Sequence, residues 1–144
     1  MSVSGADDLE RWLGEYERKL RANVRREITK TALKVNARVK RAILQGPKTG
    51  RVHTRAPGQN LSRTHQSSAE GEAPANDTGT LASSIYYSRP SPDTAQIGSR
   101  LYYAYELEFG RQGLQPRPSW RPATDAERGP FEDAIREAMR RAAE

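Results

Sequence analysis

The most regular hydrophobic pattern lies in the first third of the chain. From residue 7 to residue 44, apolar residues recur in steps of three and four, which is the spacing of one face of an α-helix. These apolar positions are Leu9, Trp12, Leu13, Tyr16, Leu20, Val24, Ile28, Ala32, Val35, Val39, Ala42 and Ile43. Ser4 with Asp7 matches a capping pair at the start, and Gly46-Pro47 is a stop signal. The pattern therefore predicts one long helix.

The length of this helix does not fit a compact domain. At a rise of 1.5 Å per residue, the helix would be about 57 Å long. A compact domain of this chain length has a radius of gyration of roughly 14–15 Å and a diameter nearer ~40 Å. We therefore expect that the helix either kinks or projects beyond its own domain and packs on another molecule.

Residues 46–79 lack a hydrophobic pattern and are rich in Gly, Pro, Ser, Thr and Asn. A stretch of this length without secondary structure is uncommon in a compact domain, and is usually functional or without fixed structure. Two short segments, residues 50–55 and 62–68, have strand-like composition and could pair around Pro57-Gly58. The region is expected to be a loop or a hairpin.

A second hairpin is predicted more strongly, after a short turn that Asp77 or Thr78 could cap. Residues 84–90 and 93–99 carry β-type residues and flank a Pro-Ser-Pro-Asp turn. The next stretch, "LYYAYELEFG", carries both helical spacing and strand alternation. We favour a short helix that ends at Gly110, with a strand as the alternative.

Residues 107–123, "LEFGRQGLQPRPSWRPA", contain three prolines within seven positions, with arginines and a tryptophan between them. Proline cannot donate to a sheet ladder and interrupts a helix interior. One interpretation is a rigid connector with Trp120 inserted in the core. The other is an interface arm that presents Arg117, Trp120 and Arg121 to a neighbour, because Arg and Trp often anchor interfaces. Both interpretations stay open at this point.

The end of the chain predicts a second helix, whose apolar stripe is Ala134, Ile135, Ala138, Met139 and Ala142, with a break or kink at Gly129-Pro130. The expected fold class is therefore α+β in a single domain. A long N-terminal helix (7–45) and a C-terminal helix (124–144) would pack on a small antiparallel sheet. The sheet and the proline-rich arm would lie in residues 80–123, after the polar loop of residues 46–79.

The composition changes this picture by making the surface large relative to the core. Only 35% of the 144 residues are hydrophobic, while 29% are charged. Such a chain is elongated, partly disordered alone, or completed by partners. It has no cysteine, which excludes disulfides and thiolate chemistry. With no apolar run of membrane-spanning length and no signal-peptide pattern, the expected compartment is a bacterial cytoplasm or a particle assembled there.

The net charge of +6 is concentrated in the long helix, where residues 18–41 carry ten basic side chains and one acid, Glu27. A basic surface of this kind suits a polyanion such as DNA, or is simply a solvated face or a subunit contact. No aromatic residue lies between Arg21 and Arg41, so base stacking is not offered there. The candidate DNA-facing residues are Lys30, Lys34, Arg38, Arg41, Lys48 and Arg51.

No catalytic constellation can be named. "GPKTGR" (residues 46–51) lacks the glycine spacing of a phosphate loop and follows a helix rather than a strand. His53 and His65, with Glu70 and Glu72, are better explained as exposed loop residues than as metal ligands. Glu106 and Glu108 are better explained as a solvated or salt-bridging pair than as a glycosidase pair. We therefore expect no enzyme activity, no metal and no cofactor.

Three linked elements resemble a known family. They are Thr-Gly-x-Leu-x-x-Ser-Ile at residues 78–85, Tyr-Ala-x-x-x-Glu-Phe-Gly at residues 103–110, and Pro-x-Pro-x-x-Arg-Pro-Ala at residues 116–123. In this order the sequence resembles the tail-component family of lambdoid tailed phages, which are neck or tail-completion proteins of the head–tail junction. Two positions depart from the family pattern, since Arg111 replaces a frequent threonine and Ser119 precedes the aromatic Trp120.

The resemblance implies a structural virion protein rather than an enzyme. It implies a subunit of a homo-oligomeric ring, expected to be a hexamer, that joins the head connector or stopper protein to the tail terminator or tail-tube protein. DNA would pass through the ring, and no membrane would be involved. The residues expected at the subunit interface are Glu106, Glu108, Phe109, Arg111, Arg117, Trp120 and Arg121. The alternative function is a DNA-binding accessory protein that uses the basic helix.

Overall fold

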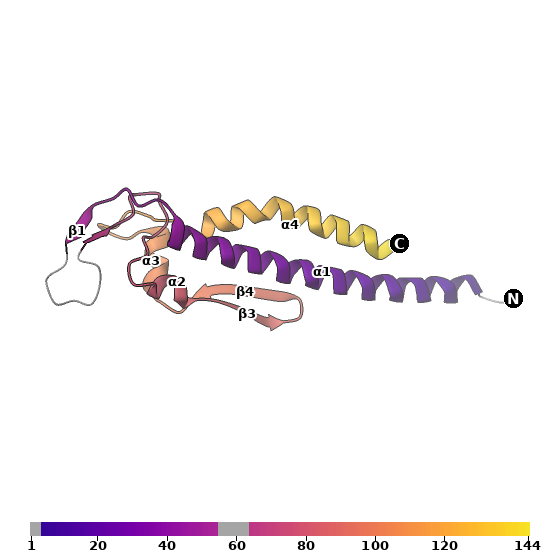
Figure 1. Ribbon diagram of the computed structural model, residues 1–144. Helices are drawn as coiled ribbons and strands as arrows, with labels where there is room; N and C mark the ends of the chain where they lie inside the picture. The colour runs from indigo at the N-terminus through magenta and orange to yellow at the C-terminus, as the bar shows by residue number, and fades with distance from the viewer. Residues whose placement is uncertain (1–3, 55–63) are drawn as a thin grey trace.

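A computed structural model describes residues 4–54 and 64–144, with the side chain of Ser4 left out. The fold is α+β, as the sequence predicts. In chain order the elements are α1 (Ser4–Gln45), β1 (Val52–Thr54), β2 (Thr64–Gln66), α2 (Thr80–Ser84), β3 (Ile85–Ser91), β4 (Thr94–Ser99), α3 (Tyr103–Phe109) and α4 (Trp120–Ala143). The molecule is elongated along α1 (Figure 1).

The first helix is a single element of 42 residues that ends where Gly46-Pro47 predicts. The Gly46 N–H donates to the Ala42 carbonyl oxygen at 2.9 Å. A Cβ atom at position 46 would lie only 2.2 Å from that oxygen, so the closing bond requires glycine. The predicted cap from Ser4 lies outside the described side chains, and Asp7 lies in the first turn.

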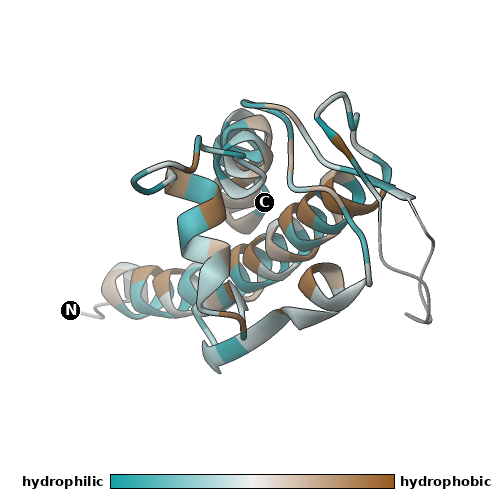
Figure 2. Ribbon diagram, turned by 90° about the vertical axis from the view of Figure 1, so that its left-hand side faces the viewer, coloured by the Kyte–Doolittle hydropathy of each residue, from teal (hydrophilic) through white to brown (hydrophobic). Residues whose placement is uncertain are grey.

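Two elements cover α1 from different sides. The helix α4 runs antiparallel to α1, and the β3–β4 hairpin packs on another side of it (Figures 1 and 2). Between them lies the main core cluster, which is Val35, Val39, Ile43, Ala82, Ile85 and Ala123, with Leu81, Ile97 and Trp120 packed against it. We expected both long helices to pack on one sheet. Instead α1 is the central element, and the strands form two separate two-stranded sheets.

Both predicted hairpins form. Strands β1 and β2 pair with His53 opposite His65, and the predicted turn at Pro57-Gly58 lies outside the described residues. Strands β3 and β4 pair with Tyr87 opposite Ile97 and shift register between Ser88 and Ser91. The stretch after β4 is helical, so the favoured prediction for α3 is confirmed, including its end at Gly110.

The tip of the second hairpin is tied to α1. The Arg25 Nε donates to the Asp93 carboxylate at 2.7 Å, with the Arg25 side chain partly exposed and the Asp93 side chain largely exposed. This hydrogen bond lowers the pKa of Asp93 and raises the pKa of Arg25. The contact fixes the hairpin along the helix rather than across it.

The C-terminal helix begins at Trp120, four residues earlier than the predicted start at residue 124. Its first turn therefore contains Pro122, where a missing N–H costs nothing because first-turn donors have no partner within the helix. Pro130 lies inside the helix but does not break it. The axis of α4 bends in Figure 1, as the kink alternative predicts.

The N-terminal part of α1 extends beyond both covering elements (Figure 1). This arrangement agrees with the expectation that the helix is too long for its own domain. Leu9, Trp12 and Leu13 are each about half exposed, and the Trp12 ring stacks on Tyr16 with centroids 5.5 Å apart. A row of large apolar side chains is thus presented to solvent.

Candidate interaction surface

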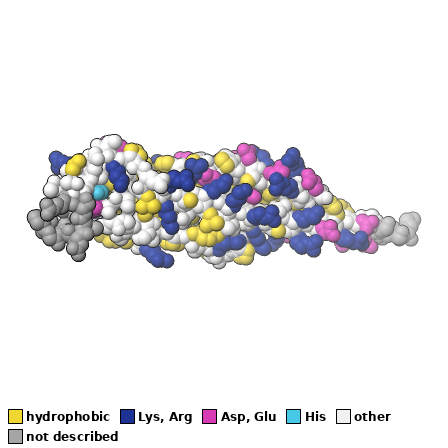
Figure 3. All heavy atoms as spheres, in the orientation of Figure 1, with side chains coloured by type: hydrophobic (Ala, Val, Ile, Leu, Met, Phe, Trp, Pro, Cys, Tyr) yellow, Lys and Arg dark blue, Asp and Glu magenta, His cyan; other side chains and the backbone are white. Residues whose placement is uncertain are grey.

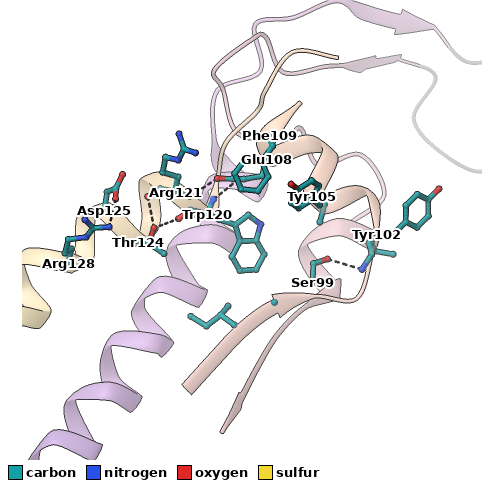
Figure 4. A pocket seen from close by; sticks show the side chains of 14 residues that line it. Ser99, Tyr102, Tyr105, Glu108, Phe109, Trp120, Arg121, Thr124, Asp125 and Arg128 are labelled. Atoms are coloured by element: carbon teal, nitrogen blue, oxygen red, sulfur yellow. Dashed lines mark hydrogen bonds and ion pairs between the residues drawn. The ribbon is translucent and has the colours of Figure 1, made fainter. Parts of the chain in front are cut away.

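The junction between α3 and α4 is built around one carboxylate. Glu108 accepts hydrogen bonds from the backbone N–H groups of Ser119 at 2.7 Å, Trp120 at 3.0 Å and Arg121 at 2.8 Å (Figure 4). The first four N–H groups of a helix have no acceptor within it. Here three of them donate to Glu108, and the fourth position is Pro122, which has no N–H. A negative charge also suits the positive end of the helix dipole.

This contact corrects the interface assignment of Glu108. The residue is only 8% exposed, and its oxygens are occupied within the chain. It joins the Glu-Phe-Gly element to the Pro-x-Pro-x-x-Arg-Pro-Ala element, which the sequence shows only as neighbours in order. Glu108 is therefore a structural cap and not a group offered to a partner.

The proline-rich segment is held as a fixed connector. The Arg117 N–H donates to the Leu107 carbonyl at 2.7 Å, and the Pro116 carbonyl accepts from the Gly71 N–H at 3.1 Å. Gly110 begins the segment with a φ of 76°, where a Cβ atom would lie 2.8 Å from the Leu114 carbonyl oxygen. These contacts favour the connector interpretation over a free arm.

This arrangement explains why the side chains of Trp120 and Arg117 are partly buried. Trp120 is half-buried and packs against the core cluster, as the connector interpretation requires. Arg117 is also half-buried and lines a small cavity beside His65 and Leu81. Neither side chain is fully exposed, which favours the connector interpretation over the interface arm for these two residues.

An aromatic surface lies on the outer side of α3. Tyr105 is 69% exposed and Phe109 is 51% exposed, and their rings are tilted with centroids 4.7 Å apart. The Arg121 guanidinium lies over the Phe109 ring at 5.9 Å from its centroid, within cation–π range. Tyr102, the residue just before α3 and three positions ahead of Tyr105, is also exposed and points outward in Figure 4.

The aromatic surface borders an open groove of about 670 Å³ between β4, α3 and α4. Ile97, Leu101 and Trp120 contribute apolar lining, and Arg121 and Arg128 contribute positive charge. Arg128 lies 3.5 Å from Asp125 one turn before it on α4. We call these residues together the aromatic groove, defined as Ile97, Gly98, Ser99, Leu101, Tyr102, Ala104, Tyr105, Glu108, Phe109, Trp120, Arg121, Thr124, Asp125 and Arg128.

Four of the seven predicted interface residues, Glu108, Phe109, Trp120 and Arg121, line the groove, and of these only Phe109 and Arg121 are exposed. Glu106 and Arg111 form an ion pair of 3.0 Å. The prediction missed Tyr102 and Tyr105 as interface residues. Their spacing with Phe109, at three and four residues, was the signal that could have placed all three on one side of α3.

The predicted DNA-facing residues do not form a free basic strip. The Arg38 Nε donates to the buried Glu127 carboxylate at 2.5 Å, and Lys34 lies 4.0 Å from the same group. Lys30 lies 3.7 Å from Glu27, and Lys48 donates to the Asn76 carbonyl. Arg41 and Arg51 are exposed. Three of the six residues, Lys34, Arg38 and Lys48, therefore join distant parts of the chain. On the side drawn in Figure 3, Lys and Arg side chains gather over the middle of the body, and acidic side chains lie mainly along its upper edge and at its tapered end.

The polar loop is organised by Glu72. This carboxylate accepts from the Thr49 hydroxyl at 2.5 Å, the Thr49 N–H at 3.0 Å and the Ala69 N–H at 2.8 Å. The Thr49 hydroxyl, followed by these two N–H groups, lowers the pKa of Glu72. Because Glu72 already uses the Thr49 donors, residues 46–51 are not a phosphate cradle. His65 lies 3.5 Å from Asp77.

The part of the chain that the structure describes contains neither a cluster of metal ligands nor a membrane-spanning helix. Within residues 4–54 and 64–144, no group of three or more His, Asp or Glu side chains is placed to hold a metal ion. The helices within those ranges are also too short or too polar to cross a membrane. Comparison with family models, curated proteins and solved structures found no match for this chain.

Proposed function

We propose that this protein is a structural subunit of a phage head–tail junction, a ring component that joins the head connector to the tail. The observation that carries the proposal is the α3–α4 junction. Two of the three family-like elements meet there through Glu108, beside an open aromatic groove. Aromatic and arginine side chains are the residues that most often anchor protein partners.

The shape of the molecule supports the same proposal. A helix that extends past its covering elements and a hydrophobic fraction of only 35% are typical of subunits that neighbours complete. Cyclic assemblies use two different patches, one on each side of the subunit. The protein would then be a component of the virion neck, assembled in the host cytoplasm, as a hexamer that contacts stopper and tail-terminator or tail-tube proteins.

The test is the morphology of particles that lack this protein. We expect full heads and complete tails to accumulate unjoined, and electron microscopy will count joined against unjoined particles. Supplying the wild-type protein should restore joining, while supplying Phe109→Ser with Arg121→Glu should not. Joined particles at normal frequency without the protein would overturn the proposal. Trp120→Ala is a poor test, because that side chain packs on the core.

DNA binding is the second candidate function. The net charge of +6 and the exposed Arg41 and Arg51 favour it. A free protein that binds DNA through phosphates loses affinity steeply as salt rises. We expect Arg41→Glu with Arg51→Glu to abolish any such binding, as measured by fluorescence anisotropy with a labelled duplex. Absence of binding by the wild type at low salt would exclude this function.

A further inference from the structure

We propose that the exposed end of α1 of one copy docks into the aromatic groove of a second copy. We call this end the acidic stripe, defined as the helical segment of residues 5–20. The inference rests on the proposed function only in that copies of the chain contact one another. It goes further by naming the two surfaces and their order, head to tail.

The acidic stripe has the side chains of an interface helix. Leu9, Trp12, Leu13, Tyr16 and Leu20 recur at three- and four-residue steps, and Leu9 is 56% exposed. At about 100° per residue these five side chains share one side of α1, while the buried Val35, Val39 and Ile43 are centred roughly 120° further round the helix. The exposed end therefore presents an apolar row of its own, as helix-in-groove recognition requires.

The charges of the two surfaces are complementary. Residues 5–20 carry five acidic and three basic side chains, and all five acids precede residue 18. Asp8 lies 3.4 Å from Arg11 and Glu17 lies 2.7 Å from Arg21, which leaves Asp7, Glu10 and Glu15 as the acids without an ion pair among the described residues. At 100° per residue, Glu10 and Glu17 flank the apolar row on one side and Asp8 and Glu15 on the other. In Figure 3 the acidic side chains gather at this tapered end. Opposite charges across an interface select the partner and fix its register.

The groove offers the matching positive charge. The Arg121 guanidinium contacts the Phe109 ring, and no ion pair to it is found within residues 4–54 and 64–144. Arg100, just outside the groove, is also exposed. The groove lining also holds two acids, since Glu108 is occupied by backbone N–H groups and Asp125 lies 3.5 Å from Arg128. Arg121 is therefore the charge of the lining that an incoming carboxylate could pair with. An acidic helix with an apolar row thus fits better than a basic one.

The positions of the two surfaces decide the order of contact. Trp120 of the groove packs beside Val35 to Ile43, while the acidic stripe lies about 40 Å away at the other end of the rigid α1. One molecule cannot fill its own groove. Each contact between two copies leaves one groove and one acidic stripe free, so the contact propagates into a ring or an open chain.

The test uses two variants of the full chain that remove one surface each. The stripe variant is Trp12→Ala with Leu13→Ala, and the groove variant is Tyr105→Ala with Arg121→Glu. Analytical ultracentrifugation of each variant alone should show self-association weakened by roughly tenfold or more, since each loses interface anchors. A mixture of the two should form a one-to-one heterodimer and nothing larger, because only one intact contact remains. Met139→Ala, a half-exposed residue elsewhere, is the matched control and should associate like the wild type.

A crosslink reports the contact even where it is weak. The chain has no cysteine, so Leu13→Cys in one copy and Thr124→Cys in another introduce the only thiols. Under oxidation, the mixture should give a disulfide-linked dimer in higher yield than either variant alone. If Leu13→Cys alone links efficiently, the stripes pair with each other and the inference is wrong. If no mixed dimer forms at high protein concentration, the inference is also wrong.

The outcomes separate this contact from the proposed function. Joined particles that need the protein but tolerate the stripe variant would keep the head–tail function and overturn the contact. Head-to-tail assembly in solution, with normal joining of particles that lack the protein, would keep the contact and overturn the function.

Discussion

The two halves of α1 differ in what surrounds them rather than in their sequence pattern. Val39 is 0% exposed and Ile43 is 1% exposed, because α4 and the β3–β4 hairpin cover them. Leu9, Trp12 and Leu13 recur at the same three- and four-residue steps, but they lie on a different side of α1 and are about half exposed. The comparison shows that hydrophobic periodicity specifies a helix, while the covering elements decide which of its apolar positions become core.

The largest expected effect contrasts one substitution in each half. Ile43→Ala should lower the free energy of unfolding by about 2–5 kcal/mol, because it removes buried volume from the core. Leu13→Ala should change it by less than about 0.5 kcal/mol in the monomer, because the side chain is already solvated. Urea denaturation at low protein concentration measures both. Equal losses would mean that the exposed half is covered in solution.

The second prediction concerns the element that covers α1. Glu108→Ala should destabilise the protein by about 1–3 kcal/mol or more, because buried N–H groups at the start of α4 lose their acceptor. Glu106, two residues earlier, forms a partly exposed ion pair with Arg111. Glu106→Ala should therefore lower the free energy of unfolding by less than about 1 kcal/mol. Thermal unfolding of the two variants compares them directly. A Glu108 variant as stable as the wild type would mean that α4 does not need this cap.

The third prediction addresses the uncovered half alone. Gly14 lies within it, and no heavy atom lies within 4 Å of a Cβ atom placed there. Gly14→Ala should stabilise the local helix by about 1 kcal/mol, because glycine is a poor helix former. Hydrogen exchange should slow for residues near position 14, with exchange near Val39 unchanged. Equal slowing at both places would show that the two halves open together.

The smallest expected effect is a pH dependence in the loop beyond α1. Hydrogen bonds from Thr49 and Ala69 place the pKa of Glu72 in the folded protein below its usual value of 4.5. The stability that Glu72 contributes is therefore present above about pH 4.5 and is lost as the pH falls through the lower folded pKa. Glu72→Gln should flatten this acid-side decline in urea titrations between neutral and acidic pH. An unchanged decline would assign it to other carboxylates, such as Asp93 or Glu137, whose pKa values are also lowered.

Local signals were sufficient to predict most elements from the sequence. The long helix, its end at Gly46-Pro47, both hairpins and the end of α3 at Gly110 depend on nearby residues, and all are confirmed. Residues 55–63, which join β1 to β2, lie outside the described structure.

The misses depend on distant partners. The predicted start of α4 is too late because Pro122 resembles a helix breaker. In the structure Pro122 lies in the first turn, where an N–H group would have no acceptor within the helix. Glu108, 11–13 residues earlier, accepts from the other N–H groups of that turn. Likewise, Arg38 looks like a free cation until Glu127 approaches it from α4. Neither contact leaves a periodic trace in the sequence.

The packing of α4 on α1 also sets the order in which the protein can be completed. Val35 and Ile43 leave the ribosome early, but Ala123, Ala138 and Ala142 are added only about 80–100 residues later. At a synthesis rate of roughly 5–20 residues per second, the buried side of α1 waits about 4–20 s for its cover. During that interval the side of α1 that α4 covers stays exposed, even after the β3–β4 hairpin has been synthesised. The last part of the chain therefore completes the core.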